Sequence, residues 1–459
     1  MTYQQRRAGK LSVLDAMRRK LPGDGLGWVT PHDSRLSAWR WRDARRWRHR
    51  FPPALRPLVW AADRLGWAGI ALIDTWQFSR AIGLGAADTA RLYLEALACG
   101  GRPLDVHVWR SLHHSRHPLP SRSAALLFSG LGQRAGHRLL ADKLKLAEHL
   151  STIGIRTPAM RGVLARSFEA DRDSDLLADA GVGPGLFLKP RHGHGGRGAF
   201  SLTVESDVWS MNGYPGTRAS VTARISRLTQ TDEVLVQDRL MSIDTLSDLA
   251  PGGRAPVLRL VTACTPQGDP FLHSAMLMVA RPGKNPSHFL EGQILAPIDL
   301  ATGRMAGGIL LARPGTVMER LWENGPSVKS RDVPSFSQAV EMTLAAMGGL
   351  PPLCVIHWDV IVTQDGPVIL EGNTAGNWIL ASLPGLLGHQ ACPLEDVIAP
   401  WTDTTSRGAV GPTTPAARAG RASGEAARLA TAPSVTTIKD GESRNSHHSD
   451  SFAAECHKN

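Results

Sequence analysis

The sequence is short of cysteine, and the cysteines it has lie far apart. Its 459 residues include five, an odd number, and no CxxC pair occurs. They are Cys99, Cys264, Cys354, Cys392 and Cys456. A disulfide framework or a zinc ribbon needs paired cysteines at short spacings, so both are disfavoured and a reducing compartment is expected.

Long apolar segments are missing as well. The best candidate for a membrane span, Leu65–Ile73, is an uncharged run of nine residues, whereas a spanning helix needs roughly twenty apolar residues. The start of the chain, Met1–Lys10, is polar, and no apolar segment typical of an export signal follows it. We therefore expect a soluble, cytoplasmic protein.

Positive charge is in excess, and it is concentrated in one region. The formal net charge is +11, and residues 1–60 alone carry fourteen Lys or Arg against four Asp. In this arm Trp39, Trp41 and Trp47 are interspersed with arginines, a mixture that suits the surface of an anionic membrane, with peripheral association as the consequence. The arm could equally bind an acidic glycan or pack on the body with its arginines outward. Because the rest of the chain is close to neutral, nucleic-acid binding is disfavoured.

Composition divides the chain into four regions. Residues 1–120 are rich in Arg and Trp and are expected to be mainly helical, whereas residues 121–233 and 234–401 mix helical and strand patterns, which indicates an α/β fold class. In residues 402–459, Ala, Ser, Thr, Gly and Arg dominate and Phe452 is the only aromatic residue. Such a segment cannot bury enough apolar surface to offset its chain entropy, so it is predicted to be disordered.

Local patterns predict the main elements. Trp60, Leu65, Ile70 and Ile73 are compatible with an amphipathic helix, as are Ala90, Leu94 and Leu97. A further helix is expected over Lys143–Leu150. Strands are expected over Gly185–Lys189, Ala199–Val204, Val234–Gln237, Leu258–Cys264 and Phe271–Val279, the last two of them paired around a turn.

A glycine-rich loop directly follows a strand that ends in Lys189. Glycines stand at Gly193, Gly195, Gly196 and Gly198, and they let the backbone approach phosphate oxygens while Lys189 adds a positive charge. The strand pattern after the loop disfavours a dinucleotide-binding fold, which needs a helix there. No Walker A sequence occurs, and a protein kinase has its lysine after the loop. A glycine-rich surface turn is the remaining alternative.

A second motif, residues 357–373, predicts a hairpin with three oxygen-bearing side chains on one face. Asp365-Gly366 is a dipeptide typical of tight hairpin turns. Asp359 and Glu371 lie at equal spacing on either side of Asp365. Glu371 and Asn373 share a face because strand side chains alternate. Carboxylates among Val, Ile and Leu are costly unless a cation pairs them, and such oxygen ligands suit Mg²⁺. A solvated hairpin face is the alternative.

Two weaker signals complete the set. Lys143 opens a helix, where it could bind phosphate or be only a solvated charge. The segment Val234–Leu240 ends a strand and could offer backbone groups to an adenine, with Asp244 placed for ribose hydroxyls; taken alone, it indicates only a core strand.

In order and spacing, these motifs resemble the ATP-grasp superfamily, and most of all its sugar-transfer-associated branch, which is found beside polysaccharide and sugar-transfer genes. The resemblance rests on DK at 142–143, KPRHGHGGRG at 189–198, VLVQDRL at 234–240, LRLVT at 258–262, APIDLATGRM at 296–305, HWDVIV at 357–362 and GPVILEGNTAGN at 366–377. It covers roughly half of the chain, from about Asp142 to Asn377.

The resemblance implies two α+β lobes that clamp ATP, with the glycine-rich lid in residues 121–233 and the metal site in residues 234–401. It assigns phosphate contacts to Lys143 and Lys189, the lid to Gly193, Gly195, Gly196 and Gly198, nucleotide contacts to Gln237, Asp238, Arg239, Leu240 and Asp244, and one or two Mg²⁺ (or Mn²⁺) ions to Asp359, Glu371 and Asn373. Lys189 and Arg259 would be catalytic, with Arg259 directed at the γ-phosphate. A strand arginine held in a salt bridge is the alternative for Arg259.

The activity implied is that of an ATP- and Mg²⁺-dependent ligase that joins a carboxylate to an amine through an acyl phosphate, on a sugar- or polysaccharide-related substrate. A kinase acting on a hydroxyl and a non-catalytic ATP-binding module are the alternatives. The sequence departs from the family pattern at Gln237, where many members have Glu, and at His357, where Gly is frequent.

Overall fold

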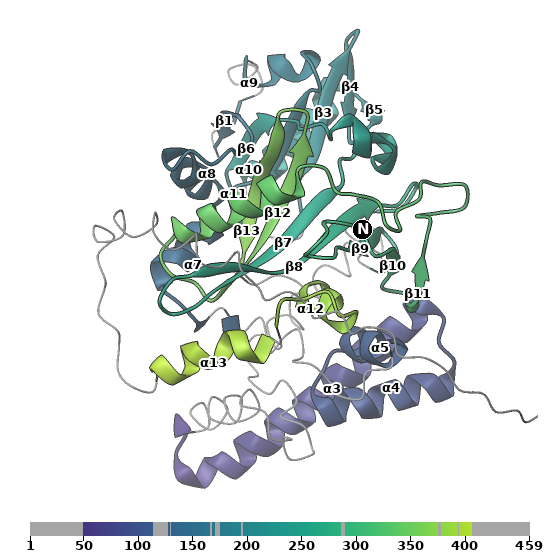
Figure 1. Ribbon diagram of the computed structural model, residues 1–459, viewed down its shortest axis with the longest axis vertical. Coiled ribbons are helices and arrows are strands. Elements are labelled where there is room, and N and C mark those ends of the chain that lie inside the picture. The colour runs from purple at the N-terminus through teal and green to yellow at the C-terminus, as the bar shows by residue number, and fades with distance from the viewer. Residues whose placement is uncertain are drawn as a thin grey trace, which may run out of the picture. The chain divides into compact units, whose positions relative to one another are not determined.

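The protein is described from a computed structural model (Figure 1). The structure describes residues 49–112, 127–128, 130–165, 168–169, 175–193, 196–285, 290–374, 378–392 and 394–405. Most of the basic arm, residues 406–459 of the predicted disordered tail and the lid residue Gly195 lie outside the described residues. The first residues of that tail, 402–405, are helical instead, because they continue the last helix of the body.

The first described region is helical, as predicted. After a short turn, η1 (Pro53–Leu55), come α3 (Arg56–Ile82), α4 (Ala86–Cys99) and α5 (Pro103–Ser111). Both α3 and α4 end at glycines in left-handed conformation, Gly83 at φ 74° and Gly100 at φ 68°, which suits a residue without Cβ. None of the described helices has the length and apolar character needed to cross a membrane.

The buried faces of these helices differ from the prediction. Leu65 is 70% exposed and Leu94 is 64% exposed, whereas α3 buries Trp67 and Phe78 and α4 buries Leu92 and Ala96. The reason is that α3 is apolar on more than one side, so hydrophobic spacing alone does not identify the side that packs.

Two antiparallel sheets form the body. The first has the order β1-β6-β2-β3-β4-β5, with β1 (Met160–Leu164), β2 (Leu186–Pro190), β3 (Phe200–Glu205), β4 (Val208–Met211), β5 (Tyr214–Gly216) and β6 (Val234–Asp238). Helix α10 (Arg218–Thr229) packs Val221 and Ile225 into the same core as Leu188, Phe200 and Val236. The predicted strands at 185–189, 199–204 and 234–237 are confirmed within one residue or two.

The second sheet has the order β11-β10-β9-β8-β7-β12-β13. Its strands are β7 (Val257–Cys264), β8 (Pro270–Ala280), β9 (Gln293–Pro297), β10 (Gly308–Leu310), β11 (Arg313–Met318), β12 (Val355–Thr363) and β13 (Gly366–Asn373). Helix α11 (Phe336–Gly348) packs on the face that carries Leu258, Leu260 and Leu277, and α12 (Trp378–Leu386) on the opposite face with Met276 and Leu295. Helix α13 (Leu394–Thr405) also contributes to the core on the second face, through Val397 and Trp401.

Shorter elements precede or join the strands, and only η3 and η4 lie between the two sheets along the described chain. They are α7 (Arg134–Ala141), α8 (Lys143–Thr152), α9 (Asp175–Ala178), η2 (Asp179–Gly181), η3 (Asp244–Leu249) and η4 (Pro251–Gly253). Helix α8, predicted from Lys143 onward, begins at that residue, with Asp142 as its N-cap. The Asp142 carboxylate accepts a hydrogen bond from the backbone N–H of Lys145 at 3.3 Å, which satisfies one of the free donors at the helix start.

Candidate active site

Three neighbouring strands bring charged side chains into one row. In the antiparallel registers, Asp359 on β12 stands opposite Arg259 on β7 and opposite Glu371 on β13. The pairing with Glu371 depends on an irregularity, because Val360 pairs with Ile369 and the next residue, Leu370, has no partner. Such a β-bulge is frequent next to active sites, where it redirects a side chain.

Arg259 and Asp359 form a buried, two-point ion pair. The Nε of Arg259 donates to Oδ1 of Asp359 at 2.9 Å, and Nη2 donates to Oδ2 at 3.0 Å. Both residues are buried, with 9% and 8% exposure. Burial raises the pKa of Asp359 to about 6 and Glu371 adds to the rise, while Arg259 opposes it. Arg259 is thus a strand arginine held in a salt bridge, which is the alternative given above to its catalytic role.

Two of the predicted metal ligands, Asp359 and Glu371, lie on this row, and Asn373 lies two residues further along β13. Glu371 stands opposite Asp359, and the amide nitrogen of Asn373 donates to Oε1 of Glu371 at 3.1 Å. Glu371 disfavours the negative charge of Asp359, and a bound divalent cation relieves such a pair. The oxygen donors therefore fit Mg²⁺, although no group of three or more His, Cys, Asp or Glu side chains that could hold a metal occurs in the described part of the chain.

Lys189 reaches the same place from the other sheet. It lies near the end of β2, is 7% exposed, and its Nζ donates to the carbonyl of the bulged Leu370 at 3.2 Å. Burial lowers the pKa of Lys189 to about 8; Glu371 opposes the shift, Lys143 adds to it and Asp359 opposes it. A lysine that gives up hydration in this way gains strongly from an incoming anion.

Lys143 completes the cluster from the first turn of α8. Its Nζ donates to the carbonyl of Gly193, the first glycine of the loop, at 2.7 Å. Burial lowers the pKa of Lys143, while Glu371, Asp232 and Asp142 oppose the shift. Lys143 thus contacts the glycine loop, and it has the same carboxylate neighbour, Glu371, as Lys189.

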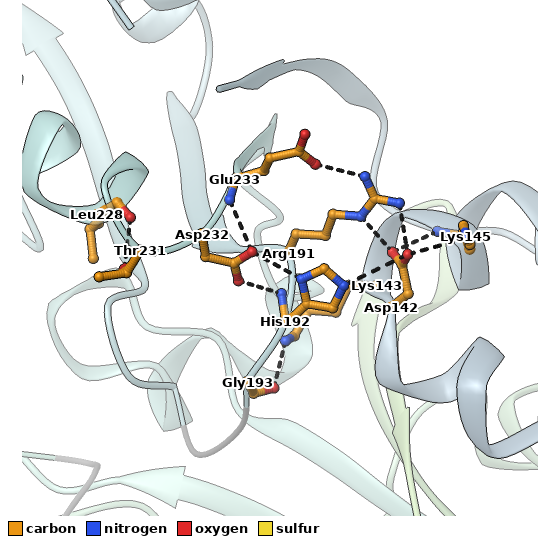
Figure 2. Close-up of polar contacts among 10 residues, drawn as sticks. All are labelled: Asp142, Lys143, Lys145, Arg191, His192, Gly193, Leu228, Thr231, Asp232 and Glu233. Carbon is orange, nitrogen blue, oxygen red and sulfur yellow. Dashed lines mark hydrogen bonds and ion pairs between the residues drawn. The ribbon is translucent and has the colours of Figure 1, made fainter. Parts of the chain in front are cut away.

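A charged network holds the base of the loop against α8 (Figure 2). Arg191 donates to both oxygens of Asp142, at 2.8 and 2.7 Å, and to Glu233 at 2.6 Å. Its neighbour His192 is held by Asp232, which accepts from the backbone N–H at 2.7 Å and lies 2.9 Å from ring Nδ1. The network therefore joins the turn before β6, the start of the loop and the N-terminus of α8.

Electrostatics stabilise this network in its charged form. Burial works to raise the pKa of Asp142, but the hydrogen bonds from Arg191 and from the backbone of Lys145 outweigh it, so the pKa of Asp142 lies below its usual value. Burial also works to raise the pKa of Asp232, but the hydrogen bonds from His192 outweigh it, so this pKa too lies below its usual value. Sequence reasoning identified Lys143 but missed Arg191 and Asp142 as partners; the Asp directly before a helix was the available signal, since it predicts an N-cap.

The loop glycines adopt conformations that favour glycine. Gly193, Gly196 and Gly198 have φ of 97°, 65° and 82°, in the left-handed region. A Cβ at Gly198 would lie 2.9 Å from a methyl carbon of Leu228, whereas Gly193 and Gly196 have open space beside them. Two of these positions are therefore glycine for backbone reasons alone, and the close approach at Gly198 adds a packing reason.

The predicted nucleotide-contact residues are only partly joined to this cluster. Gln237 is buried on β6, next to β2, whereas Asp238 is paired with Arg161 at 2.5 Å and Arg239 donates to the carbonyl of Gly253 at 2.7 Å. Leu240 is half-buried after the strand, and Asp244 begins η3. In the contacts of the described residues, none of these side chains bonds to the lysines or to the metal-site carboxylates.

His357 stands apart from the polar contacts of the site. It lies opposite Asn373, two residues before Asp359 on β12, is fully buried, and packs edge-on against Trp378 with ring centroids 4.3 Å apart. Burial holds the pKa of His357 well below its usual range. Its ring nitrogens have no hydrogen-bond partner among the described residues, so the imidazole is neutral and acts as a packing group against Trp378.

Comparison with known proteins adds a family. No curated protein matches the sequence. Among solved structures, the N5-carboxyaminoimidazole synthase from Aspergillus clavatus with ADP and 5-aminoimidazole ribonucleotide is 10% identical, with 54% of this chain and 48% of that chain covered and a TM-score of 0.33. The D-alanine–D-alanine ligase from Bacillus anthracis with ATP is 13% identical, with 60% and 69% covered and a TM-score of 0.35. This chain thus spans about half the length of the synthase.

A further structural neighbour is the D-Ala:D-Ser ligase from Enterococcus faecalis, which is 12% identical, with 59% of this chain and 63% of that chain covered and a TM-score of 0.37. The family assignment comes from a different comparison, the model of the sugar-transfer associated ATP-grasp family, which matches residues 124–390. That match covers more than half of the chain and includes both sheets and every residue of the cluster. The chain therefore belongs to the sugar-transfer associated ATP-grasp family.

Proposed function

We propose that the protein is an ATP- and Mg²⁺-dependent ligase that joins a carboxylate to an amine, with an acyl phosphate as intermediate and a sugar- or polysaccharide-related substrate. The observation that carries the proposal is the convergence of Lys143, Lys189 and Arg259 with Asp359 and Glu371, supplied by α8, β2, β7, β12 and β13. Positive groups gathered around a carboxylate pair, beside a glycine loop, suit a triphosphate with its metal.

In this proposal the lysines bind the phosphates of ATP. Lys189 is already desolvated, with a pKa of about 8, so a bound phosphate raises that pKa and fixes the ammonium in its charged form. Lys143 donates to the carbonyl of Gly193, and a phosphate can take the place of that carbonyl. Arg259, held by Asp359, presents its remaining N–H groups to negative charge that develops during transfer of the γ-phosphate.

Asp359, Glu371 and Asn373 would hold Mg²⁺, or Mn²⁺ in its place, and the ion would neutralise phosphate charge when bound. The chain's own residues keep the site ready for it: Arg259 orients the Asp359 carboxylate through two hydrogen bonds, and the bulge at Leu370 turns Glu371 toward it. Asp359 can bind both Arg259 and a cation, because Arg259 lies on the strand at one side of Asp359 and Glu371 on the strand at the other side.

The remaining assignments follow from the family. Gln237, Asp238, Arg239 and Leu240 would line the adenine and Asp244 the ribose, while the loop that includes Gly193, Gly195, Gly196 and Gly198 would cover the phosphates and exclude water from the acyl phosphate. The cytoplasmic location, the contact of residues 1–60 with an anionic membrane, and the division of the chain at residues 120, 233 and 401 remain predictions.

The test is to incubate the enzyme with ATP, Mg²⁺ and panels of amino acids, amino sugars and uronic acids, and to follow ADP release and product masses. We expect ADP release that depends jointly on one acid and one amine, with a product equal to their sum less water. When the acid carries ¹⁸O in its carboxylate, one label should appear in the released phosphate, because the acyl phosphate transfers a carboxylate oxygen. A stable phosphoester formed with a single hydroxyl acceptor would establish a kinase instead.

Residue roles are tested in the same assay. Glu371→Gln keeps the size of the side chain and removes its charge, so we expect turnover to fall by about 100-fold or more, as for the loss of a charge-stabilising group. Glu319→Gln, at an exposed glutamate paired with Lys329, is the matched control and should be fully active. Normal turnover by Glu371→Gln would remove the metal assignment.

A further inference from the structure

Helix α3 carries an apolar stripe on its outer side. Leu58, Leu65, Leu72 and Trp76 are 67%, 70%, 53% and 54% exposed. At 3.6 residues per turn, spacings of seven and four residues place them along one side of the helix. Of the fourteen large hydrophobic residues that are exposed in the described part of the chain, seven lie between Leu55 and Trp76. Six of these seven belong to α3, so this helix carries the largest share of the exposed large apolar side chains in the described part of the chain.

The opposite side of α3 is buried, and it carries large apolar side chains together with four polar ones, Asp63, Arg64, Thr75 and Ser79. Trp67 and Ile70 pack near Tyr93 and Leu97 of α4, and Phe78 joins the core with α4 and α5, where the three helices lie together (Figure 1). An exposed apolar stripe of this kind is normally covered by a protein partner or by lipid. None of the described helices can span a membrane. A helix lying flat in the membrane interface, with its exposed stripe in lipid and its other side packed on α4 and α5, accounts for the apolar residues on both sides.

Positive charge accompanies the stripe. The guanidinium of Arg80 lies 4.9 Å from the ring centroid of Trp76, and that of Arg64 lies 5.6 Å from the ring of Trp60. Residues 1–60, which lead into α3 and include its first turn, carry fourteen Lys or Arg against four Asp, a net charge of +10. Anionic headgroups complement this charge, and acyl chains complement the stripe. A second copy docked through the same face would bring two such positive segments together, which is unfavourable.

We propose that α3 docks on the surface of an anionic lipid bilayer, with Leu58, Leu65, Leu72 and Trp76 entering the boundary between headgroups and acyl chains. The proposal goes beyond the ligase activity and does not depend on it. It also differs from binding by the basic arm alone, because it requires a particular apolar face of a folded helix.

The test is co-sedimentation of the full chain with vesicles of phosphatidylcholine and phosphatidylglycerol, compared with vesicles of phosphatidylcholine only. Leu65→Gln/Leu72→Gln removes the middle of the stripe; Leu94→Gln, at a leucine of α4 that is 64% exposed, is the matched control. We expect the wild type and Leu94→Gln to bind anionic vesicles equally, and the double variant to bind at least about tenfold more weakly, since two buried leucines contribute strongly to partition. Circular dichroism should show the same helix content in all three proteins.

A second measurement reports the geometry. Brominated lipids should quench the tryptophan fluorescence of the wild type, and Trp76→Phe should remove part of the quenched signal. The proposal is overturned by salt-sensitive binding that the double variant retains, which would assign the contact to the basic arm. It is equally overturned by absence of binding in the wild type, as when another segment of the chain covers the stripe, and by a wild-type dimer that the double variant dissociates.

Discussion

Replacing Lys189 with methionine removes a buried ammonium group and should change how stability depends on pH. Lys189 is 7% exposed, and burial lowers its pKa from 10.5 to about 8. Because one pKa unit corresponds to about 1.36 kcal/mol, keeping this lysine charged in the folded protein costs about 3 kcal/mol at pH 7 relative to the unfolded chain.

The sign follows from proton binding. Between pH 8 and pH 10.5 the unfolded chain keeps the Lys189 proton and the folded protein has lost it. Stability of the wild type therefore rises with pH in this window, by up to about 1.4 kcal/mol per pH unit. Below pH 8 both states hold the proton, and the full cost is present. The methionine variant has no such group and lacks the rise.

A second effect opposes the first but does not depend on pH. Methionine leaves the carbonyl of Leu370 without the hydrogen bond that Lys189 donates at 3.2 Å, and an unsatisfied buried polar group costs about 1–3 kcal/mol. At pH 7 the two effects largely cancel, so the two proteins should have similar stability there. At pH 10.5 the wild type should be more stable, by about 3 kcal/mol more than at pH 7.

The measurement is urea-induced unfolding of both proteins, followed by circular dichroism from pH 7 upward, with all other titrating groups common to the pair. Lys145→Met, at a lysine whose side chain is 64% exposed on α8, is the matched control and should follow the wild-type curve. Parallel pH curves for the wild type and Lys189→Met would refute the reasoning. Isothermal titration should also show that Lys189→Met no longer binds ATP.

Three further substitutions test other contacts of the site. Asp359→Asn leaves the buried Arg259 without its charged partner, so thermal denaturation should show a loss of about 3–5 kcal/mol. Asp142→Ala removes the N-cap of α8, worth about 1 kcal/mol, and also the two hydrogen bonds from Arg191, so the total loss of stability should exceed that of the cap alone; calorimetry should also show weaker ATP binding. Gly372→Ala would place a Cβ 2.8 Å from the Trp358 ring, so unfolding should show a destabilisation of about 1–3 kcal/mol.

Each of these has a control. Arg259→Met combined with Asp359→Asn should recover much of the lost stability, because no unpaired charge remains. Thr217→Ala removes the N-cap of α10 and should cost about 1 kcal/mol without weakening ATP binding. Gly69→Ala, at a helical glycine with open space beside it, should be neutral or stabilising. Equal losses at Gly372 and Gly69, or equal ATP affinity in Asp142→Ala and Thr217→Ala, would contradict these explanations.

Much of the fold and the position of the site could be predicted from local patterns. The strands near residues 186, 234, 257 and 270, the helix at Lys143 and the hairpin of residues 355–373 all occur, because apolar alternation and turn residues are local signals. The pairing of Asp359 with Glu371 was predicted from equal spacing about Asp365. The structure reaches it differently, through a two-residue loop between Thr363 and Gly366 and a bulge at Leu370.

Contacts between distant segments could not be predicted in this way. Arg191 and Asp142 are far apart in sequence and meet only when the start of α8 packs beside the end of β2; nothing in the local pattern of either indicates the other. The choice between the two roles of Arg259 also depends on a neighbouring strand. On α3, apolar residues occur on both sides, so spacing predicted the helix but not that Leu65 would be 70% exposed.

Leu370, the unpaired residue in the hairpin of β12 and β13, determines which side chains of this sheet face the site. In a regular strand Leu370 would stand across from Asp359, and Glu371 would point into the packed layer beside Trp358, where Gly372 now leaves room for the indole. One additional peptide unit exchanges these two orientations and at the same time frees the carbonyl that Lys189 meets. An insertion of a single residue is therefore enough to convert an apolar ladder into an acidic one.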